Sequence, residues 1–231
     1  MRRWRKRCCS EYGLSVVTIQ DSVGQDAQVL TQRYQYIRAH TEFLASKLDP
    51  EDQVVQSMPD CSPTKWHRAH VTWFFETFLL KPFHADYREL DAAYAFLFNS
   101  YYEAAGPRHT RSERGMITRP SVEAVGEYRR HVDAAMVELL SQPLTKEITD
   151  LVVLGFHHEQ QHQELLLMDI KHLFSLNPMA PAYSDDVALQ QSAPATEQGW
   201  QRFDGGIVAM GHKGTDFCFD NELPQLSLIH I

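Results

Sequence analysis

The hydrophobic positions in the first three quarters of the chain recur at helical spacing in four separate segments. Residues 27–47 carry apolar side chains three or four positions apart, with no proline or glycine among them, which predicts a helix. A second helix is expected over residues 62–80, because its opening Ser-Pro pair is favoured in the first turn of a helix. Residues 120–141 and 146–175 show the same periodicity, and the second of these is followed by Asn177-Pro178.

The order of these segments predicts a mainly α protein, with an up-and-down four-helix bundle over residues 26–177. Residues 178–198 are rich in proline, alanine and serine, which is typical of a linker. Residues 199–225 have short apolar stretches split by glycine and aspartate. That pattern favours strands and turns, in a stretch too short to bury its own core. Residues 1–25 are basic at the start with no apolar segment following, so we expect a disordered or spurious extension rather than a targeting peptide.

The amino-acid composition and net charge argue against several classes of protein. With 231 residues and 43% hydrophobic positions, the chain can bury a sizeable core. Its formal net charge of −8 argues against a nucleic-acid partner. No apolar run reaches the roughly 18–20 residues that cross a bilayer. The four cysteines show no CxxC spacing, so neither a zinc knuckle nor a disulfide framework is indicated, and a cytoplasmic location fits best.

Candidate chemistry lies in the last predicted helix, in the segment HHEQQH. His158 and His162 are four residues apart, so both imidazoles project from one helical face and can reach one metal ion. Buried imidazoles without partners cost free energy, and a metal ion would remove that cost. The same letters match the HExxH string of zinc proteases, with Glu159 as general base. That alternative lacks a third ligand placed downstream as those families place it.

The third ligand is expected from another helix, and His70 is the best candidate. It lies between two tryptophans on the inward stripe of residues 62–80. His67 is about 60° off that stripe, at about 100° per residue, so we expect a surface or capping histidine there. His157 is expected to point away from the site. Glu164 is a candidate for a further ligand or for a group that supports the ligands.

Several segments closely resemble one known family. SPTKWHRAHVTWFFETFLL, FNSYYEAAGPRHTRSERG, RPSVEAVGEYRRHVDAAM and HHEQQHQELLLMDIKH are similar to the amino-terminal, DinB-like domain of ergothioneine-biosynthesis sulfoxide synthases (EgtB type). The likeness runs from about residue 32 to residue 174. GGIVAMGHKGTDFCFDNELP resembles the opening of the formylglycine-generating-enzyme-like (sulfatase-modifying-factor) domain of that family. The resemblance implies a DinB-like four-helix bundle, a linker and a short piece of this α+β domain.

The resemblance also implies a cofactor and a reaction. The family's Fe(II) ligands match His70, His158 and His162. The oxidant would be O2, the sulfur acceptor hercynine (a trimethylated histidine), and the sulfur donor γ-glutamylcysteine or cysteine. Three neutral imidazoles leave the full 2+ charge on the iron, which favours an anionic thiolate more than a site with two histidines and one carboxylate would.

Substrate-binding residues follow from the same likeness. Gln161 matches a position that contacts the histidine-derived substrate. Arg108 and Arg111 match arginines that hold the carboxylates of the donor, and Arg114 is the alternative because the loop alignment can slip. A bidentate arginine suits a carboxylate. The other interpretation of these arginines, a solvated basic loop, has similar weight.

The carboxyl-terminal part of the sequence departs from the family. The family's second domain is long and supplies a tyrosine proton donor, whereas here the likeness stops after about the first hairpin. Residues 226–231, LSLIHI, can be back-translated into the mosaic-end adapter of transposase-based sequencing libraries. We therefore expect a non-native tail on a fragment of a longer protein, with weak or no sulfoxide synthase activity, and we name no catalytic residue.

Other functions share parts of this pattern. A DinB-like thiol transferase uses a similar bundle and three histidines, typically with zinc or nickel and without O2. Ovothiol- and selenoneine-type synthases join sulfur or selenium to an imidazole with other donors. A metal-binding bundle without enzymatic activity is a further alternative, and the protease is the least favoured.

Overall fold

The computed structural model describes residues 27–100, 106–184 and 199–230. It divides after Ser184 into a helical unit and a second, smaller unit, and each is described by itself. The expectations for residues 1–25, for most of the 178–198 linker and for residue 231 lie outside the described residues.

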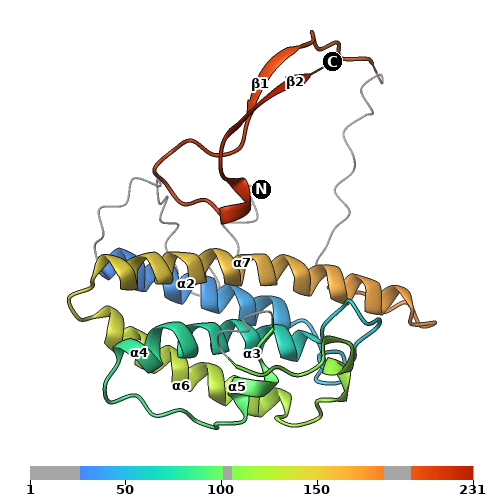
Figure 1. Ribbon diagram of the computed structural model, residues 1–231. Coiled ribbons are helices and arrows are strands. Elements are labelled where there is room, and N and C mark those ends of the chain that lie inside the picture. Colours follow the sequence, from blue (N-terminus) through green and yellow to red (C-terminus); the bar gives the residue numbers. More distant parts are fainter. Residues whose placement is uncertain (1–26, 101–105, 185–198, 231) are drawn as a thin grey trace. The chain divides into compact units, whose positions relative to one another are not determined.

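Four long helices build the helical unit: α2 (Ala27–Ala45), α3 (Thr64–Phe75), α6 (Val122–Leu140) and α7 (Lys146–Ser175). They run side by side (Figure 1), with α3 packed on α6 and α7 and with α2 packed on the same two helices. The periodicity predicted all four, because an amphipathic stripe is a local property of the chain. The described part of the chain is therefore mainly helical, as expected.

The starts of α6 and α7 are set by their capping residues. The Ser121 hydroxyl accepts a hydrogen bond from the Ala124 N–H. The Thr145 hydroxyl likewise accepts from the Ile148 N–H at 3.3 Å. Each hydroxyl satisfies one of the backbone donors that a helix leaves open at its amino end.

The second predicted helix continues further than residue 80 and changes its winding. After α3 the chain forms a π-helical turn, η1 (Glu76–Leu80), and then the short α4 (Lys81–Phe83). Every residue of α3 is buried, so its polar side chains must find partners inside the protein. The connection to α6 contains α5 (Tyr94–Leu97) and a 3-10 turn, η3 (Arg111–Met116).

An ionic network, buried at its two arginines and at Glu159, joins the helices beside the apolar core. Arg38 of α2 contacts Asp133 of α6 at 2.7 Å and Glu159 of α7 at 3.1 Å. Arg129 of α6 also contacts Glu159, at 3.1 Å, and Glu42 of α2, at 2.6 Å. A buried ion pair contributes little net stability, but loss of one partner leaves a costly unpaired charge. The network therefore favours one alignment of α2, α6 and α7.

The second unit is an antiparallel hairpin of β1 (Gly206–Met210) and β2 (Leu226–His230), with a 3-10 turn, η4 (Asp220–Glu222), between them. Gly206 lies opposite His230, and Met210 lies opposite Leu226. The strands and turns expected from the sequence pattern are present. The segment from residue 226, which we had separated from residues 199–225, supplies the second strand.

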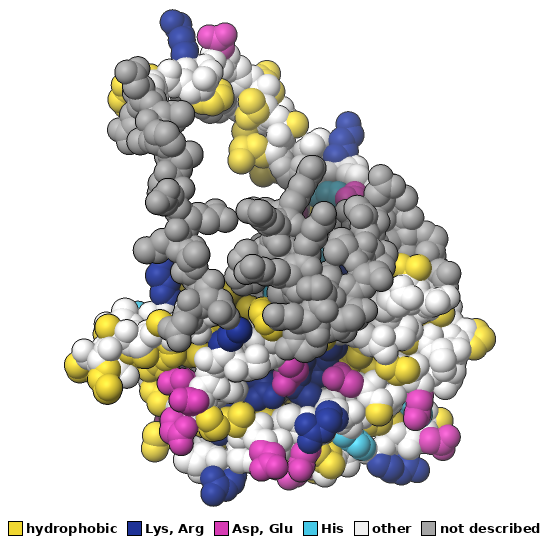
Figure 2. Space-filling view, turned by 180° about the vertical axis from the view of Figure 1, so that it is seen from behind, with side chains coloured by type: hydrophobic (Ala, Val, Ile, Leu, Met, Phe, Trp, Pro, Cys, Tyr) yellow, Lys and Arg dark blue, Asp and Glu magenta, His cyan; other side chains and the backbone are white. Residues whose placement is uncertain are grey.

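No residue of 199–229 is buried. Hydrophobic side chains are exposed on the hairpin, and Figure 2 shows several of them in yellow on this unit. This agrees with the expectation that the segment has no core of its own. Across the described residues, no helix is both long enough and apolar enough to cross a membrane.

Candidate metal centre

Three histidines from two helices meet inside the helical unit. His158 and His162 lie one turn apart on α7 and face His70 of α3, and one ring nitrogen of each lies within 4.8 Å of the others. The Nε2 atoms of His70 and His158 are 3.2 Å apart. The ring of His162 lies 4.7 Å from each of the other two rings, centroid to centroid. This cluster could hold a metal ion.

The spacing of the His70 and His158 nitrogens fits a shared ion. An imidazole nitrogen binds a divalent metal such as zinc at about 2.0–2.1 Å. Two such ligands would be about 2.9 Å apart at a right angle and about 3.4 Å apart at the tetrahedral angle, by the same bond length. The distance of 3.2 Å between the Nε2 atoms of His70 and His158 falls between these values.

All three histidines are held in the neutral form that binds metals. Burial lowers the pKa of His158 to about 4. Burial, followed by the charge of neighbouring histidines, holds the pKa values of His70 and His162 well below the ordinary range. A neutral imidazole has one lone pair free for coordination, so these side chains can act as ligands at neutral pH.

The orientation of His70 is set by its surroundings. Its Nδ1–H donates to the carbonyl oxygen of Phe98 at 2.6 Å, because a carbonyl can only accept. That bond leaves the lone pair on Nε2, the atom that faces His158. Trp66, one turn earlier, and Trp73, one turn later, stack on the His70 ring at 4.6 and 5.5 Å.

His162 is half-buried and is connected to a further histidine, which is buried. The Nδ1 atoms of His162 and His67 are 2.9 Å apart, and Nε2 of His67 is 2.9 Å from Oδ2 of Asp169. The expectation that His67 is a surface or capping residue is wrong, since its side chain is only 4% exposed. The reason is that α7 covers the side of α3 on which His67 lies.

His158 is positioned by packing. Its ring lies 4.8 Å from the ring of Phe74, and its Nδ1 is buried without a hydrogen-bond partner among the described residues. Buried ring nitrogens are usually hydrogen-bonded. The contact of His158 with the cluster is made by its other nitrogen, Nε2, which lies 3.2 Å from Nε2 of His70.

The arginines of the basic loop lie in different environments. Arg108 and Arg111 are exposed, and Arg111 donates to the carbonyl oxygen of Asp60. Arg114 is buried, with its guanidinium 3.4 Å from the centre of the Trp66 ring. It donates to the hydroxyls of Ser62 and Ser100. Among these three arginines, Arg114 is the one that stacks on Trp66, whose ring in turn stacks on His70.

The remaining predicted residues on α7 lie on other faces. Gln161 and Glu164 are exposed. Leu165, three residues after His162 and so on the face expected to turn inward, is also exposed, at 37%, because Leu166 and its face turn toward the core instead. His157, expected to point away, is outside the histidine cluster.

Glu159 is not placed as a protease base. Its carboxylate is fully buried and bound by Arg38, Arg129 and the Thr41 hydroxyl. Burial alone would raise its pKa, but the two guanidinium groups lower the pKa below its usual value. The match of HEQQH to HExxH is therefore a coincidence of letters, since this carboxylate neutralises core arginines.

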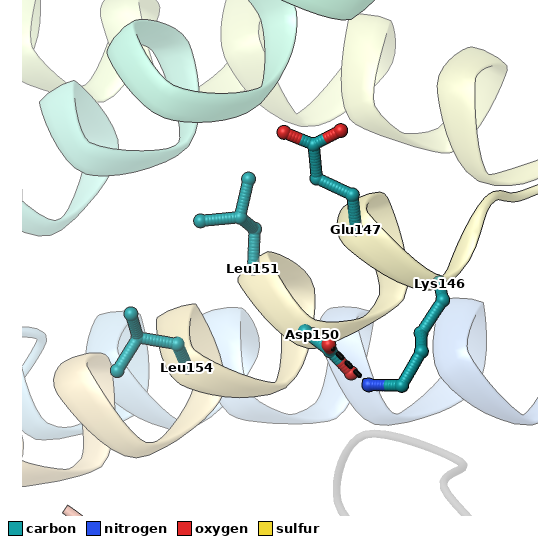
Figure 3. Close-up of a pocket in the computed structure, with 5 residues that line it drawn as sticks. All are labelled: Lys146, Glu147, Asp150, Leu151 and Leu154. Atoms are coloured by element: carbon teal, nitrogen blue, oxygen red, sulfur yellow. Dashed lines mark hydrogen bonds and ion pairs between the residues drawn. The ribbon is translucent and has the colours of Figure 1, made fainter. Parts of the chain in front are cut away.

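A surface hollow of ≈ 490 Å³ lies at the amino-terminal end of α7. Figure 3 shows its lining side chains, which all come from this one helix: Lys146, Glu147, Asp150, Leu151 and Leu154. Lys146 and Asp150 are exposed and paired with each other. Because no other helix contributes to the lining, we assign no function to this hollow.

Neither His67 nor Asp169 was identified from the sequence as a neighbour of the site. The available signal was that Asp169 follows His162 by seven residues, on the same face of one helix. A search for matching family models and for similar curated proteins found none. What supports a metal centre is therefore the convergence of three neutral histidines from α3 and α7, of which His70 and His158 are buried and His162 is half-buried.

Proposed function

We propose that the helical unit is a DinB-like four-helix bundle that binds Fe(II) through His70, His158 and His162. The proposed activity is that of an ergothioneine-biosynthesis sulfoxide synthase. The observation that carries the proposal is the composition of the cluster, which within the described residues consists of histidines alone. The ordered motifs of residues 32–174 support the choice of reaction.

The reaction would join hercynine to a thiol, γ-glutamylcysteine or cysteine. One C–H bond of the imidazole and one S–H bond are lost, a C–S bond and an S=O bond form, and O2 is reduced to one sulfoxide oxygen and one water. Bound Fe(II) would supply the redox chemistry that lets O2 react with closed-shell substrates.

The residues of the chain would hold the metal and orient its ligands. Phe98 and the two stacked tryptophans fix the His70 ring. Burial is the main cause of the lowered pKa values of His70 and His162. The permanent positive charge of Arg114, close to the cluster, is a smaller cause that lowers both pKa values further. A cation in this position favours anionic substrates, such as the carboxylates of hercynine and of the thiol donor.

A zinc-dependent thiol transferase is the second candidate, because the geometry also suits zinc. The separation of 3.2 Å between the Nε2 atoms of His70 and His158 fits a tetrahedral ion about as well as an octahedral one. The two functions differ in metal preference and in the need for O2. An ovothiol- or selenoneine-type synthase would join sulfur or selenium to an imidazole with a different donor.

The test is metal binding followed by substrate binding. The metal-free chain would be titrated anaerobically with Fe(II) and, separately, with Zn(II). Nitric oxide would then be added to the iron form as an EPR probe. We expect one Fe(II) per chain, and an EPR signal that changes when γ-glutamylcysteine is added and changes again with hercynine. Failure to bind iron, or a signal that neither substrate alters, contradicts the proposal, and zinc binding alone supports the transferase.

A further inference from the structure

A chain of hydrogen bonds crosses the interface of α3 and α7 twice beside the histidine cluster. It begins at Asp169 on α7, passes to His67 on α3 and returns to His162 on α7, with both steps 2.9 Å long. Its members are largely buried, with His67 4% exposed and Asp169 9% exposed.

The direction of each hydrogen bond in this chain follows from the group that donates to Asp169. The backbone N–H of Ser62 donates to Oδ2 of Asp169 at 2.8 Å, so this oxygen is an acceptor. Nε2 of His67 must then carry the hydrogen that it shares with Oδ2. In the neutral imidazole, Nδ1 of His67 is left without a hydrogen and can only accept.

The same logic determines the tautomer of His162. Because Nδ1 of His67 accepts, Nδ1 of His162 must carry the hydrogen between the two rings. The lone pair of His162 is thereby confined to Nε2. Metal-binding histidines commonly donate their second N–H to a carboxylate, carbonyl or water, which fixes the ring and its tautomer. Here a second histidine lies between the ligand and the carboxylate.

We propose that His67, held by Asp169, is a positioning residue that orients His162 and directs its Nε2 toward the metal ion. This inference rests on the proposed metal site, and it does not depend on the identity of the substrates. The three ligands are then held in three ways: His70 by a backbone carbonyl, His162 through His67, and His158 by packing on Phe74.

The inference is tested by metal affinity and by the spectrum of bound Co(II), using the full chain. His67→Phe keeps a ring in the interface but removes both hydrogen bonds. We expect Co(II) and Zn(II) to bind about 10- to 100-fold more weakly, the usual effect of losing such a supporting group, with altered visible absorption of the Co(II) form. His67→Gln can still donate to Asp169 and accept from His162, so it should recover part of the affinity.

His172→Phe is the matched control. His172 also lies on α7 and makes a hydrogen bond of 2.8 Å, to the Ser57 hydroxyl, but it is not part of the chain that ends at His162. We expect its metal affinity and Co(II) spectrum to equal those of the wild type. Circular dichroism and urea unfolding would report whether each variant is folded.

A double-mutant cycle separates positioning from general structural support. If His67 acts through His162, then His67→Phe should weaken metal binding no further once His162→Ala is present. In the His158→Ala background, the same substitution should retain its effect. Additive losses with His162→Ala would overturn the inference.

The outcomes also distinguish this inference from the proposed function. A wild-type chain that binds no metal removes both. A wild type that binds metal, together with a His67→Phe variant of equal affinity and spectrum, overturns the positioning role and leaves the metal site intact. If His67→Phe does not fold, Asp169→Asn takes its place, since it removes the charge that anchors His67. A folded Asp169→Asn variant with wild-type affinity overturns the inference equally.

Discussion

At the scale of single residues, the cluster depends on which nitrogen of each imidazole carries the hydrogen. A histidine four residues from another is common, but a shared metal site requires unprotonated nitrogens that face each other. Here the carbonyl of Phe98 and the side chain of His67 each occupy one nitrogen of a proposed ligand. The nitrogens that are free to bind a metal ion are therefore determined by these hydrogen-bond partners as well as by the positions of the histidines.

Single substitutions of the ligands provide the first prediction. His70→Ala, His158→Ala and His162→Ala should each weaken Fe(II) binding, so that one equivalent of iron no longer fills the site, because two imidazoles alone would have to hold the ion. The measurement is anaerobic titration with quantification of bound iron.

His157→Ala is the control for these variants, since it removes an imidazole from the same helix one position away from His158. It should bind one iron per chain as the wild type does. Unchanged stoichiometry in all three ligand variants would show that the ligand assignment is wrong.

At the scale of elements, α3 and α7 approach closely where α7 has a glycine. A Cβ atom on Gly155 would lie 2.6 Å from Cε1 of Phe75 and 3.1 Å from Cε1 of Phe74. Both rings are 1% exposed, so neither can move out of the way into solvent. The small residue allows the contact between helices that brings His158 to His70.

Gly155→Ala should therefore destabilise the protein although alanine favours helices. Overpacking of a core costs about 1–3 kcal/mol, which exceeds the gain in helix propensity of about 1 kcal/mol. Urea unfolding would measure the difference.

Gly126→Ala on α6 is the matched comparison, because its Cβ would meet only the ends of two arginine side chains, at 3.4 and 3.7 Å. That variant should be stabilised by about 0.5–1 kcal/mol. Equal effects at the two glycines would contradict the close packing of α3 on α7.

The ionic network between helices predicts a dependence on pH. Burial alone would raise the pKa of Glu42, but Arg129 and Arg68 hold the pKa below its ordinary value. A carboxylate with a lowered pKa in the folded state stabilises the fold above its unfolded pKa of about 4.5, and this contribution is lost as the pH falls below that value.

Glu42→Gln removes this contribution. The variant should have a lower Tm than the wild type at pH 7, and its Tm should fall less steeply as the pH decreases below about 4.5. Thermal unfolding of the metal-free protein between about pH 3 and pH 7, a range that includes the ordinary pKa of glutamate, would measure both slopes. Parallel curves for the two proteins would show that Glu42 does not contribute to acid sensitivity.

At the scale of the whole molecule, the two units differ in how their backbones are protected. The helical unit has a continuous buried core, whereas none of residues 199–229 is buried. A two-stranded hairpin is at best marginally stable by itself in water. Local opening free energies follow the extent of burial.

Hydrogen exchange should therefore separate the units. Amides of β1 should exchange far faster than those in the middle of α7 when the full chain is measured by mass spectrometry at neutral pH. Protection of β1 equal to that of α7 would contradict the prediction, and it would show that the hairpin is covered in solution.

Much of the helical unit was predictable from the sequence because the relevant information is local. The spacing of apolar residues determined the four long helices, and the predicted range 146–175 agrees with the bounds of α7. The separation of His158 and His162 by one turn is also local, since it follows from helix geometry alone. His70 could be selected as their partner because it lies on an apolar stripe between two tryptophans.

Other features were decided only by the tertiary structure. Whether His67 is exposed, which arginine approaches the cluster, and where Glu159 points all depend on the rotation of each helix relative to its neighbours. A helical periodicity defines a broad inward face but not which helix covers its edges. His67 lies at such an edge, and it became part of the site because α7, with Asp169 and His162, packs against that side of α3.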